Sequence, residues 1–369
     1  MSFKLECVKC KSTFPFDIKL NTCPHHNKHY GYLQIIYDSK KYKPLPVKNT
    51  FVDENTFGDK SIIVNKNTFV DLGQVITPII KINNFSKKYG LKNIYVKDEG
   101  KNPTGSFKDR ENFIFFNYLL EHNIKESIYI ISSGNAAIST TAYAKLAGLK
   151  CSCYLPTKTS SSKKEAIKFH LGEVLEEDVS YETIYNNLVI NPPSGINATP
   201  GVCPLKEEGD KMIAYEIIEQ IGLPDKVFVP CGNGTLLWSI FKGFKEIKDA
   251  GRIIKLPQMI GVQIEGGDPL KHALNKGEDY VILEDAPDSL AEGIIATESY
   301  SSPKTMIAIK SSEGTIISVS EQEIIKAHQE ITDLEEILPE ITSSVVYAAL
   351  KKVSINNEEL VICINTGCK

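Results

Sequence analysis

From about residue 91 to the C-terminus, short runs of β-branched residues alternate with longer segments in which apolar residues have helical spacing. The strand-like runs are 93–97, 127–132, 150–155, 226–230, 258–265 and 360–365. The helical segments begin near Phe107, Asn135, Ser161, Gly209, Gly234, Ser320 and Ile341. Such alternation forms βαβ units, so the pattern predicts a largely parallel sheet covered by helices on both faces. With 369 residues the chain is longer than one core of ordinary size, and two domains are expected.

The composition is that of a globular protein and indicates neither a nucleic-acid nor a membrane partner. Apolar residues make up 42% and charged residues 24%, and the net charge of -4 is not gathered into long blocks of one sign. No stretch approaches the roughly 18 apolar residues that cross a bilayer, and the N-terminus lacks the apolar segment of a signal peptide. The nine cysteines are odd in number and scattered, which indicates reduced thiols. We therefore expect a cytoplasmic protein.

The first 38 residues contain a set of potential metal ligands. Cys7, Cys10, Cys23 and His26 have the spacing C-x2-C-x12-C-x2-H. This set supplies three thiolates and one imidazole, enough for a structural zinc ion with tetrahedral geometry. His25 is an alternative fourth ligand, and a metal-free loop with ordinary Cys and His side chains is the alternative to the whole site. The segment is predicted to be zinc-ribbon-like.

Two glycine-containing turns each follow a predicted strand and open a predicted helix. The first reads SSGNA (132–136), and the second reads GNGT (232–235). Backbone N–H groups at a helix N-terminus favour an anionic ligand, although Ser and Asn are also ordinary capping residues. The second turn has neither the P-loop pattern nor the dinucleotide-binding pattern. Open α/β sheets bind ligands at the carboxyl ends of strands, so two such turns predict a binding site there.

Lys108 follows the turn NPTGSF and lies in the first turn of the next predicted helix. The positive end of the helix dipole and burial both disfavour a protonated amine, so a lysine placed there suits Schiff-base chemistry. Taken alone, the residue is as easily a surface lysine paired with Asp109 or Asp98.

Together, and in this order, the motifs resemble those of the threonine synthases, a family of pyridoxal-phosphate enzymes with the fold of the tryptophan synthase β-subunit. The motifs are NPTGSFKDR, SSGNAA, EEGDKMIAYEI, VFVPCGNGTLLWSIFKGFKE and the terminal TGCK. The resemblance runs from about residue 75 to the C-terminus. It implies a two-domain α/β fold with mostly parallel sheets: a zinc-ribbon-like segment at 1–38, a large domain at 39–106 and 207–369, and a small domain at 107–206.

The resemblance also implies roles for residues that would hold pyridoxal 5'-phosphate. Lys108 would form the Schiff base with the cofactor and move substrate protons. Asn135 would bind the 3-hydroxyl of the pyridine ring, and Thr366 would face the ring nitrogen. The residues that would surround the cofactor phosphate are Gly232, Asn233, Gly234 and Thr235.

The implied reaction converts O-phospho-L-homoserine and water to L-threonine and phosphate in a homodimeric enzyme. Backbone N–H groups around Ser133, Gly134 and Ala136 would bind the substrate carboxylate. Three places depart from the family pattern. Glu111 stands where Gly usually follows KDR, and the stretch CPLKEEGDKM (203–212), with Lys206, lies where the family holds the substrate phosphate. A lysine there provides a point charge but not the bidentate fork of an arginine. The terminal TGCK lacks the second Gly of the usual TGxG. The alternatives are a related replacement enzyme acting on a substrate such as O-phosphoserine, and a catalytically inactive relative.

Overall fold

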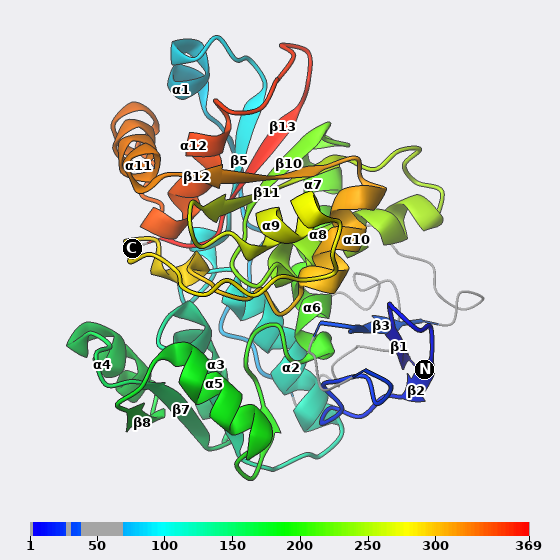
Figure 1. The fold of residues 1–369 in the computed structure, drawn as a ribbon, viewed down its shortest axis with the longest axis vertical. Helices are drawn as coiled ribbons and strands as arrows, with labels where there is room; N and C mark the ends of the chain where they lie inside the picture. The colour runs from blue at the N-terminus through cyan, green and yellow to red at the C-terminus, as the bar shows by residue number, and fades with distance from the viewer. Residues whose placement is uncertain (1–2, 27–30, 38–68, 369) are drawn as a thin grey trace.

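The computed structural model describes residues 3–26, 31–37 and 69–368, and contains two mostly parallel sheets and a small antiparallel one (Figure 1). Residues 38–68, part of the predicted large domain, lie outside the described residues. In the part of the chain that the structure describes, no helix is both long and apolar enough to span a membrane.

The largest sheet has six strands. Their spatial order is β12 (Thr315–Val319), β11 (Gln258–Ile264), β10 (Lys226–Pro230), β13 (Val361–Asn365), β5 (Ile94–Asp98) and β4 (Ile79–Lys81). All neighbouring pairs are parallel except β4 with β5. Helices cover its two faces (Figure 1), and each layer of helices packs on the sheet through its own apolar cluster. One cluster involves α1 (Asn83–Lys88), α11 (Glu321–Glu335) and α12 (Val345–Ala349), and the other α7 (Met212–Ile221), α8 (Thr235–Asp249), α9 (Pro269–Lys276) and α10 (Ser302–Ser311).

A second sheet of four parallel strands forms the lower part of the molecule in Figure 1. Its order is β8 (Glu173–Glu177), β7 (Cys151–Pro156), β6 (Ile128–Ile131) and β9 (Ile196–Asn197). The helices around it are α2 (Lys108–Glu121), α3 (Asn135–Ala147), α4 (Ser161–Phe169), α5 (Tyr181–Ile190) and α6 (Pro204–Asp210). The predicted parallel α/β architecture is confirmed, and all six predicted strands are present.

Helix ends follow the local sequence. Ser320 and Glu323 form a capping box at the start of α11, each side chain bonding the other's backbone N–H. Gly148 ends α3 in the left-handed conformation with φ 68°, which glycine adopts without a steric penalty. Three short 3-10 helices complete the described elements: η2 (Glu99–Lys101), η3 (Glu292–Ile294) and η4 (Ile341–Ser344).

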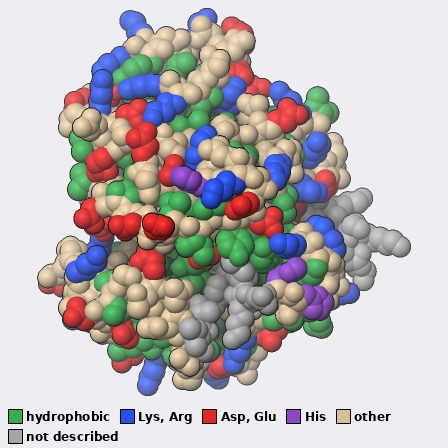
Figure 2. All heavy atoms as spheres, viewed as in Figure 1, with side chains coloured by type: hydrophobic (Ala, Val, Ile, Leu, Met, Phe, Trp, Pro, Cys, Tyr) green, Lys and Arg blue, Asp and Glu red, His purple; other side chains and the backbone are tan. Residues whose placement is uncertain are grey.

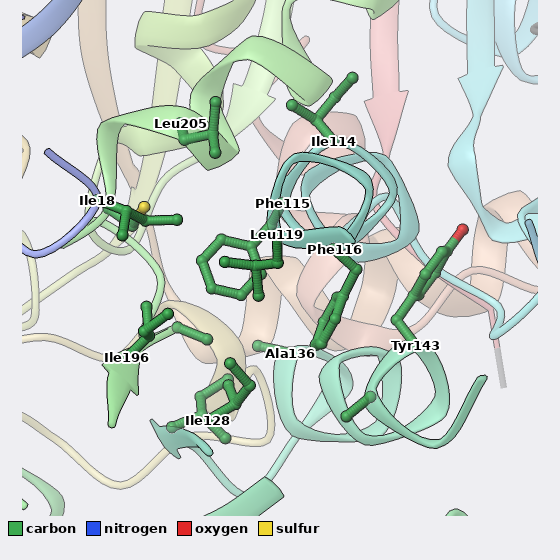
Figure 3. Packing of buried hydrophobic residues seen from close by; sticks show 14 of the residues in the cluster. Ile18, Ile114, Phe115, Phe116, Leu119, Ile128, Ala136, Tyr143, Ile196 and Leu205 are labelled. Carbon is green, nitrogen blue, oxygen red and sulfur yellow. The ribbon is translucent and has the colours of Figure 1, made fainter. Parts of the chain in front are cut away.

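The N-terminal segment forms a three-stranded antiparallel sheet in the order β2 (Thr13–Pro15), β1 (Lys4–Cys7) and β3 (Leu33–Ile36). It shares an apolar core with α2, α3, α6 and the second sheet. Figure 3 shows Phe115 and Leu119 of α2 in the middle of this core, between Ile18 of the N-terminal segment, Leu205 of α6 and Ala136 of α3. The N-terminal sheet is therefore packed on the rest of the protein.

A buried ion cluster fixes the start of α2 to the large sheet. Arg110 Nε donates to Glu99 Oε2 at 2.6 Å, and its Nη1 and Nη2 donate to Glu216 at 2.6 and 2.8 Å. Lys97 pairs with Glu216 and donates to the backbone carbonyl of Thr77 at 2.6 Å. The four charged side chains are at most 1% exposed. Burial alone would raise the pKa of the Glu99 carboxyl, but the Arg110 guanidinium holds it below its ordinary value.

A second buried ion cluster joins the N-terminal sheet to α6. Lys304 Nζ donates to the carbonyl of Leu33 at 3.0 Å, and Lys242 Nζ donates to that of Ile35 at 2.7 Å. Each lysine also pairs with a glutamate of α6, and Glu208 is the partner of Lys242. The backbone carbonyls of β3 therefore accept hydrogen bonds from two lysines whose charges are neutralised by glutamates of α6.

Replacing Arg110 with methionine should strongly destabilise the protein. The Glu99 and Glu216 carboxylates would stay buried without their guanidinium partner, and breaking a buried pair in this way typically costs about 3–5 kcal/mol. The urea midpoint of unfolding measures the loss. Arg252→Met is the matched control, because Arg252 and Glu219 are each 31% exposed and such pairs contribute only about 0–1 kcal/mol. Equal midpoints for the two variants would contradict the assigned role.

Glu208 should make the protein sensitive to acid. Burial alone would raise its pKa, but the ammonium groups of Lys211 and Lys242 lower the pKa to about 2, from an ordinary value of 4.5. The stabilisation is thus complete above pH 4.5 and is lost as the pH falls toward 2. Glu208→Gln should lower the thermal midpoint at pH 7 and flatten its dependence on pH below 4.5. Glu126→Gln, at an exposed pair with Lys19, should reproduce the wild-type curve.

Candidate active site

Three loops meet at one edge of the large sheet. They follow β10, β13 and β5, which are neighbouring parallel strands, so their carboxyl ends lie at the same edge. The loops carry the GNGT turn at 232–235, the terminal segment 366–368, and the segment 102–107 that leads into α2. Ligands of open α/β sheets bind at such an edge. The strand order β10, β13, β5 brings the three loops together there.

The terminal segment lies against the loop before α2. Phe107 N donates to the carbonyl of Thr366 at 3.0 Å, and Cys368 N donates to that of Gly105 at 3.0 Å. Gly105 has φ +83°, a conformation that favours glycine, and the turn it makes leads directly into α2. Thr366 is thereby fixed beside the helix that begins with Lys108.

Lys108 lies at the start of α2 with 13% of its side chain exposed. Its Nζ is 4.2 Å from the centroid of the Phe107 ring and forms an ion pair with Glu111 one turn further along the helix. Asp98 and Asp109, the partners expected for a surface lysine, have other contacts: Asp98 pairs with Lys101 and Asp109 turns back to the preceding loop. The Lys108 amine is therefore held at the edge of the site by Glu111, and not by Asp98 or Asp109 as expected for a surface lysine.

Asp109 holds the loop before α2. Its carboxylate accepts hydrogen bonds from Thr104 N at 2.6 Å, Thr104 Oγ1 at 2.7 Å and Ser139 Oγ of α3 at 2.6 Å. Burial raises the pKa of this carboxyl, and the hydrogen bonds oppose the increase. The acid next to Lys108 therefore has a positioning role, joining α2 to α3.

The GNGT turn places the start of α8 at the same edge. Gly234 precedes Thr235, the first residue of α8, and has φ 83°. A Cβ atom at Gly234 would lie 2.2 Å from Thr305 Oγ1, so the close approach to α10 requires glycine. Thr235 Oγ1 bonds Ser301 Oγ at 2.9 Å. The N–H groups in the first turn of α8 have no intrahelical acceptors and suit a phosphate.

The SSGNA turn supplies a similar helix start from the second sheet. It follows β6, and α3 begins at Asn135. A Cβ atom added to Gly134 would meet nothing within 4 Å, so the turn faces open space. Ser133, Gly134 and Asn135 are partly exposed, whereas Ala136 is buried in the shared core. The first-turn N–H groups of α3 are thus available to an anion such as a carboxylate.

Glu340 connects the start of α3 to the segment after β13 and was not identified from the sequence. Its Oε2 accepts a hydrogen bond from Asn135 Nδ2 at 2.8 Å, and its Oε1 accepts one from Thr366 Oγ1 at 2.9 Å. Ser343 Oγ lies 2.7 Å from the same threonine hydroxyl. One carboxylate therefore spans Asn135 and Thr366, the two residues predicted to bind the cofactor ring. The sequence contains no motif at this position, only an acid between Pro339 and an apolar residue.

Lys206 lies on α6, behind Glu111, with 2% of its side chain exposed. Its Nζ donates to the carbonyl of Ala198 at 2.8 Å and lies 3.4 Å from Glu111 Oε2. Burial lowers the pKa of the Lys206 amine, and Glu111 opposes the decrease. A Cβ atom at Gly209 would lie 2.0 Å from the carbonyl oxygen of Arg110, so α6 is pressed against the backbone of α2. Lys206 is thus close to the site but is not an open side chain.

The four predicted metal ligands lie together in the N-terminal segment. The ligand atoms of Cys7, Cys10, Cys23 and His26 all lie within 4.8 Å of one another. Cys10 Sγ and Cys23 Sγ are 3.8 Å apart, about the separation of two sulfurs that are each about 2.3 Å from one tetrahedral ion. His26 Nε2 is buried without a hydrogen-bond partner, whereas His25 Nδ1 lies 3.1 Å from Ser12 Oγ. The orphaned nitrogen and the three thiols fit a zinc ion.

The residues at the sheet edge have the chemistry that pyridoxal phosphate needs. Lys108 provides an amine for the aldehyde of the cofactor. Asn135 and Thr366 provide hydrogen-bond donors, and both already bond the carboxylate of Glu340. Two helix starts provide N–H groups for a phosphate and a carboxylate. Figure 2 shows hydrophobic and acidic side chains along the junction between the upper and lower parts of the molecule on this face.

Comparisons with known proteins show the family to which the chain belongs. Residues 70–367 match the family described as "Pyridoxal-phosphate dependent enzyme". The threonine synthase of Methanocaldococcus jannaschii is 32% identical over 379 aligned positions, which cover 98% of this chain and 91% of that protein. The threonine synthase of Methanosarcina acetivorans is 30% identical over 373 positions, covering 99% and 91%.

Solved structures with a similar fold come from other enzymes. An L-serine ammonia-lyase from the fungus Rhizomucor miehei has a TM-score of 0.70 at 19% identity, covering 80% of this chain and 94% of that one. Maize serine racemase has a TM-score of 0.68 at 20% identity, covering 80% and 88%. At these identities the similarity concerns the fold alone.

Proposed function

Because the chain belongs to the pyridoxal-phosphate-dependent enzymes, and within them to the threonine synthase family, we propose that it converts O-phospho-L-homoserine and water to L-threonine and phosphate. The observation that carries this proposal is the place of Lys108, whose amine lies at the sheet edge where the GNGT turn and Thr366 also lie. The two threonine synthases described above match almost the whole chain.

The cofactor, when bound, stabilises the electron pair that stays on the substrate after a bond to Cα breaks. Lys108 removes the Cα proton and later returns protons to the substrate. Asn135 and Thr366 orient the cofactor ring from opposite sheets, and the residues that surround its phosphate are Gly232, Asn233, Gly234 and Thr235. Departure of the substrate phosphate and addition of water complete the reaction.

The substrate is positioned by its two charged ends. The backbone around Ser133, Gly134 and Ala136 binds the carboxylate at the start of α3. Lys206 contributes a positive charge near the substrate phosphate, and its 2% exposure makes it a point charge behind Glu111 rather than an exposed donor.

We propose the same domain division as the sequence predicts, with 39–106 and 207–369 forming a large domain and 107–206 a small one. The two separate parallel sheets support this division. Closure of the small domain would exclude water from the site. The proposal includes a homodimer, which rests on the resemblance to the family, and a cytoplasmic location, which rests on the composition and the cysteine pattern.

Lys108→Ala should abolish both cofactor attachment and turnover. Borohydride reduction of the wild-type protein should fix the cofactor on Lys108, as detected by mass spectrometry, and the variant should carry none. Release of phosphate from O-phospho-L-homoserine, with formation of threonine, should fall by more than about 10³-fold, because the covalent link and the proton acceptor are lost together.

Lys101→Ala is the control for this experiment, because Lys101 is 60% exposed and lies outside the site. It should retain cofactor attachment and activity. A wild-type protein that carries the cofactor but acts on O-phosphoserine instead of O-phosphohomoserine would refute the substrate and preserve the family assignment. Labelling at another lysine would refute the role of Lys108.

We also propose a structural zinc ion at Cys7, Cys10, Cys23 and His26. Four protein ligands leave no open position, so the ion would stabilise the N-terminal sheet without taking part in catalysis. Purified protein should contain about one zinc per chain by elemental analysis. Cys7→Ala should lose it, and His25→Ala should keep it.

Equal zinc in wild type and Cys7→Ala would contradict this site. Loss of zinc from His25→Ala but not from His26→Ala would show that the neighbouring histidine is the ligand. A chelator should lower the thermal midpoint of the wild type and leave that of Cys7→Ala unchanged, since binding to the folded state alone stabilises it.

A further inference from the structure

Glu111 is a buried carboxylate shared by two amines. It lies on α2 one turn after Lys108, and its side chain is 1% exposed. Oε1 contacts Lys108 Nζ, and Oε2 lies 3.4 Å from Lys206 Nζ of α6. Oε2 has no hydrogen-bond partner within normal hydrogen-bond geometry. The carboxylate is therefore held between the amine at the site and a second amine in the interior.

A second acid, Asp210, lies in the same buried region on α6. Both of its carboxylate oxygens are buried without hydrogen-bond partners. Burial first, and then the charge of Glu111, raise the pKa of Asp210 well above its ordinary value, while Lys108 opposes the increase. The environment of Asp210 thus favours the neutral form of its carboxyl group.

The other charges that face this region are Arg110 and Glu99, which neutralise each other in the ion cluster at the start of α2. We call Lys108, Glu111, Lys206 and Asp210 the Glu111 cluster. It contains two amines and two carboxyl groups, and only Lys108 reaches the site. A proton gained by Lys108 therefore has Glu111 as a buried acceptor in direct contact with the amine.

The proposed reaction requires the Lys108 amine to accept and release protons repeatedly. A neutral amine that removes one proton becomes an ammonium and cannot act as a base again until that proton leaves. Bulk water is a poor acceptor in a closed site, and a carboxylate in contact with the amine is a direct one.

We propose that Glu111 is a catalytic residue that takes a proton from the Lys108 ammonium and returns it within each turnover, and this inference rests on the proposed function. In the first step the Cα–H bond breaks, its electron pair stays on the substrate, and an N–H bond forms at Lys108. In the second step that N–H bond breaks and an O–H bond forms at Glu111, leaving a neutral amine and a neutral acid. The same transfers in reverse return the proton to the substrate. Lys206 positions the carboxylate throughout.

The decisive variant is Glu111→Gln, which preserves the shape of the side chain and one acceptor oxygen but cannot take up a proton. Cofactor attachment to Lys108, measured by borohydride reduction and mass spectrometry, should equal that of the wild type. Exchange of the α-hydrogen of L-threonine or L-serine with solvent deuterium, followed by proton NMR, should slow by about 10²-fold. In the wild type, onward transfer of the proton to Glu111 favours breaking of the Cα–H bond, whereas in the variant the Lys108 ammonium must form without a proton acceptor in contact with it.

Steady-state turnover should change in the same way. In Glu111→Gln, kcat for O-phospho-L-homoserine should fall by about 10²-fold, with KM within about 3-fold of the wild-type value. Glu111→Asp retains an acid and should recover at least about 10-fold of the lost exchange rate. Asp249→Asn removes a carboxylate from an exposed ion pair with Lys245 and should leave both rates unchanged.

Two outcomes would overturn the proposal. Equal α-hydrogen exchange in Glu111→Gln and wild type would show that the carboxylate only neutralises charge. Loss of cofactor attachment in Glu111→Gln would show that it positions the lysine. Because α-hydrogen exchange involves no leaving group, it tests Glu111 even if phosphate release from O-phospho-L-homoserine fails and the proposed substrate is wrong.

Discussion

The site depends on the bond between the Arg110 guanidinium and its two buried glutamates. Glu99 follows β5 and Glu216 lies on α7, so this interaction joins the first turn of α2 to the large sheet. Helix α2 in turn contacts α3 and α6, which carry Asn135 and Lys206. A buried pair of this kind contributes less to net stability than its Coulomb energy suggests, but one unpaired member is very costly. Its effect here is to allow only one position for the helix that begins with Lys108.

The family resemblance implied that the GNGT turn, Thr366 and Lys108 lie together, and the strand order explains why. The runs at 226–230, 360–365 and 93–97 are continuous and apolar, as expected of strands buried on both faces, and buried parallel strands have a common carboxyl edge. This rule places the GNGT turn, Thr366 and the segment before Lys108 together without any knowledge of side-chain contacts. Local chemistry was also reliable where it is self-contained, as in the capping box of Ser320 and Glu323.

What could not be predicted depends on contacts between distant segments. Strand β12, at the edge of the large sheet, is only partly buried and lacks a continuous apolar run, and β8 has two apolar residues among three acidic ones. Glu340 lies 205 positions from its partner Asn135. Glu111 and Lys206 looked like two unrelated departures from a family pattern, whereas in the structure each is the other's counter-charge. Their pairing follows from the close packing of α6 on α2 at Gly209.

The lysines that bond the β3 carbonyls have a consequence for how such a chain evolves. Lys242 and Lys304 are buried beneath the N-terminal sheet and use its backbone as an acceptor. Without the N-terminal segment, these amines would lose their carbonyl acceptors. The extension and the body of the protein are therefore coupled at positions 242 and 304, where a change in one part alters the hydrogen bonding of the other.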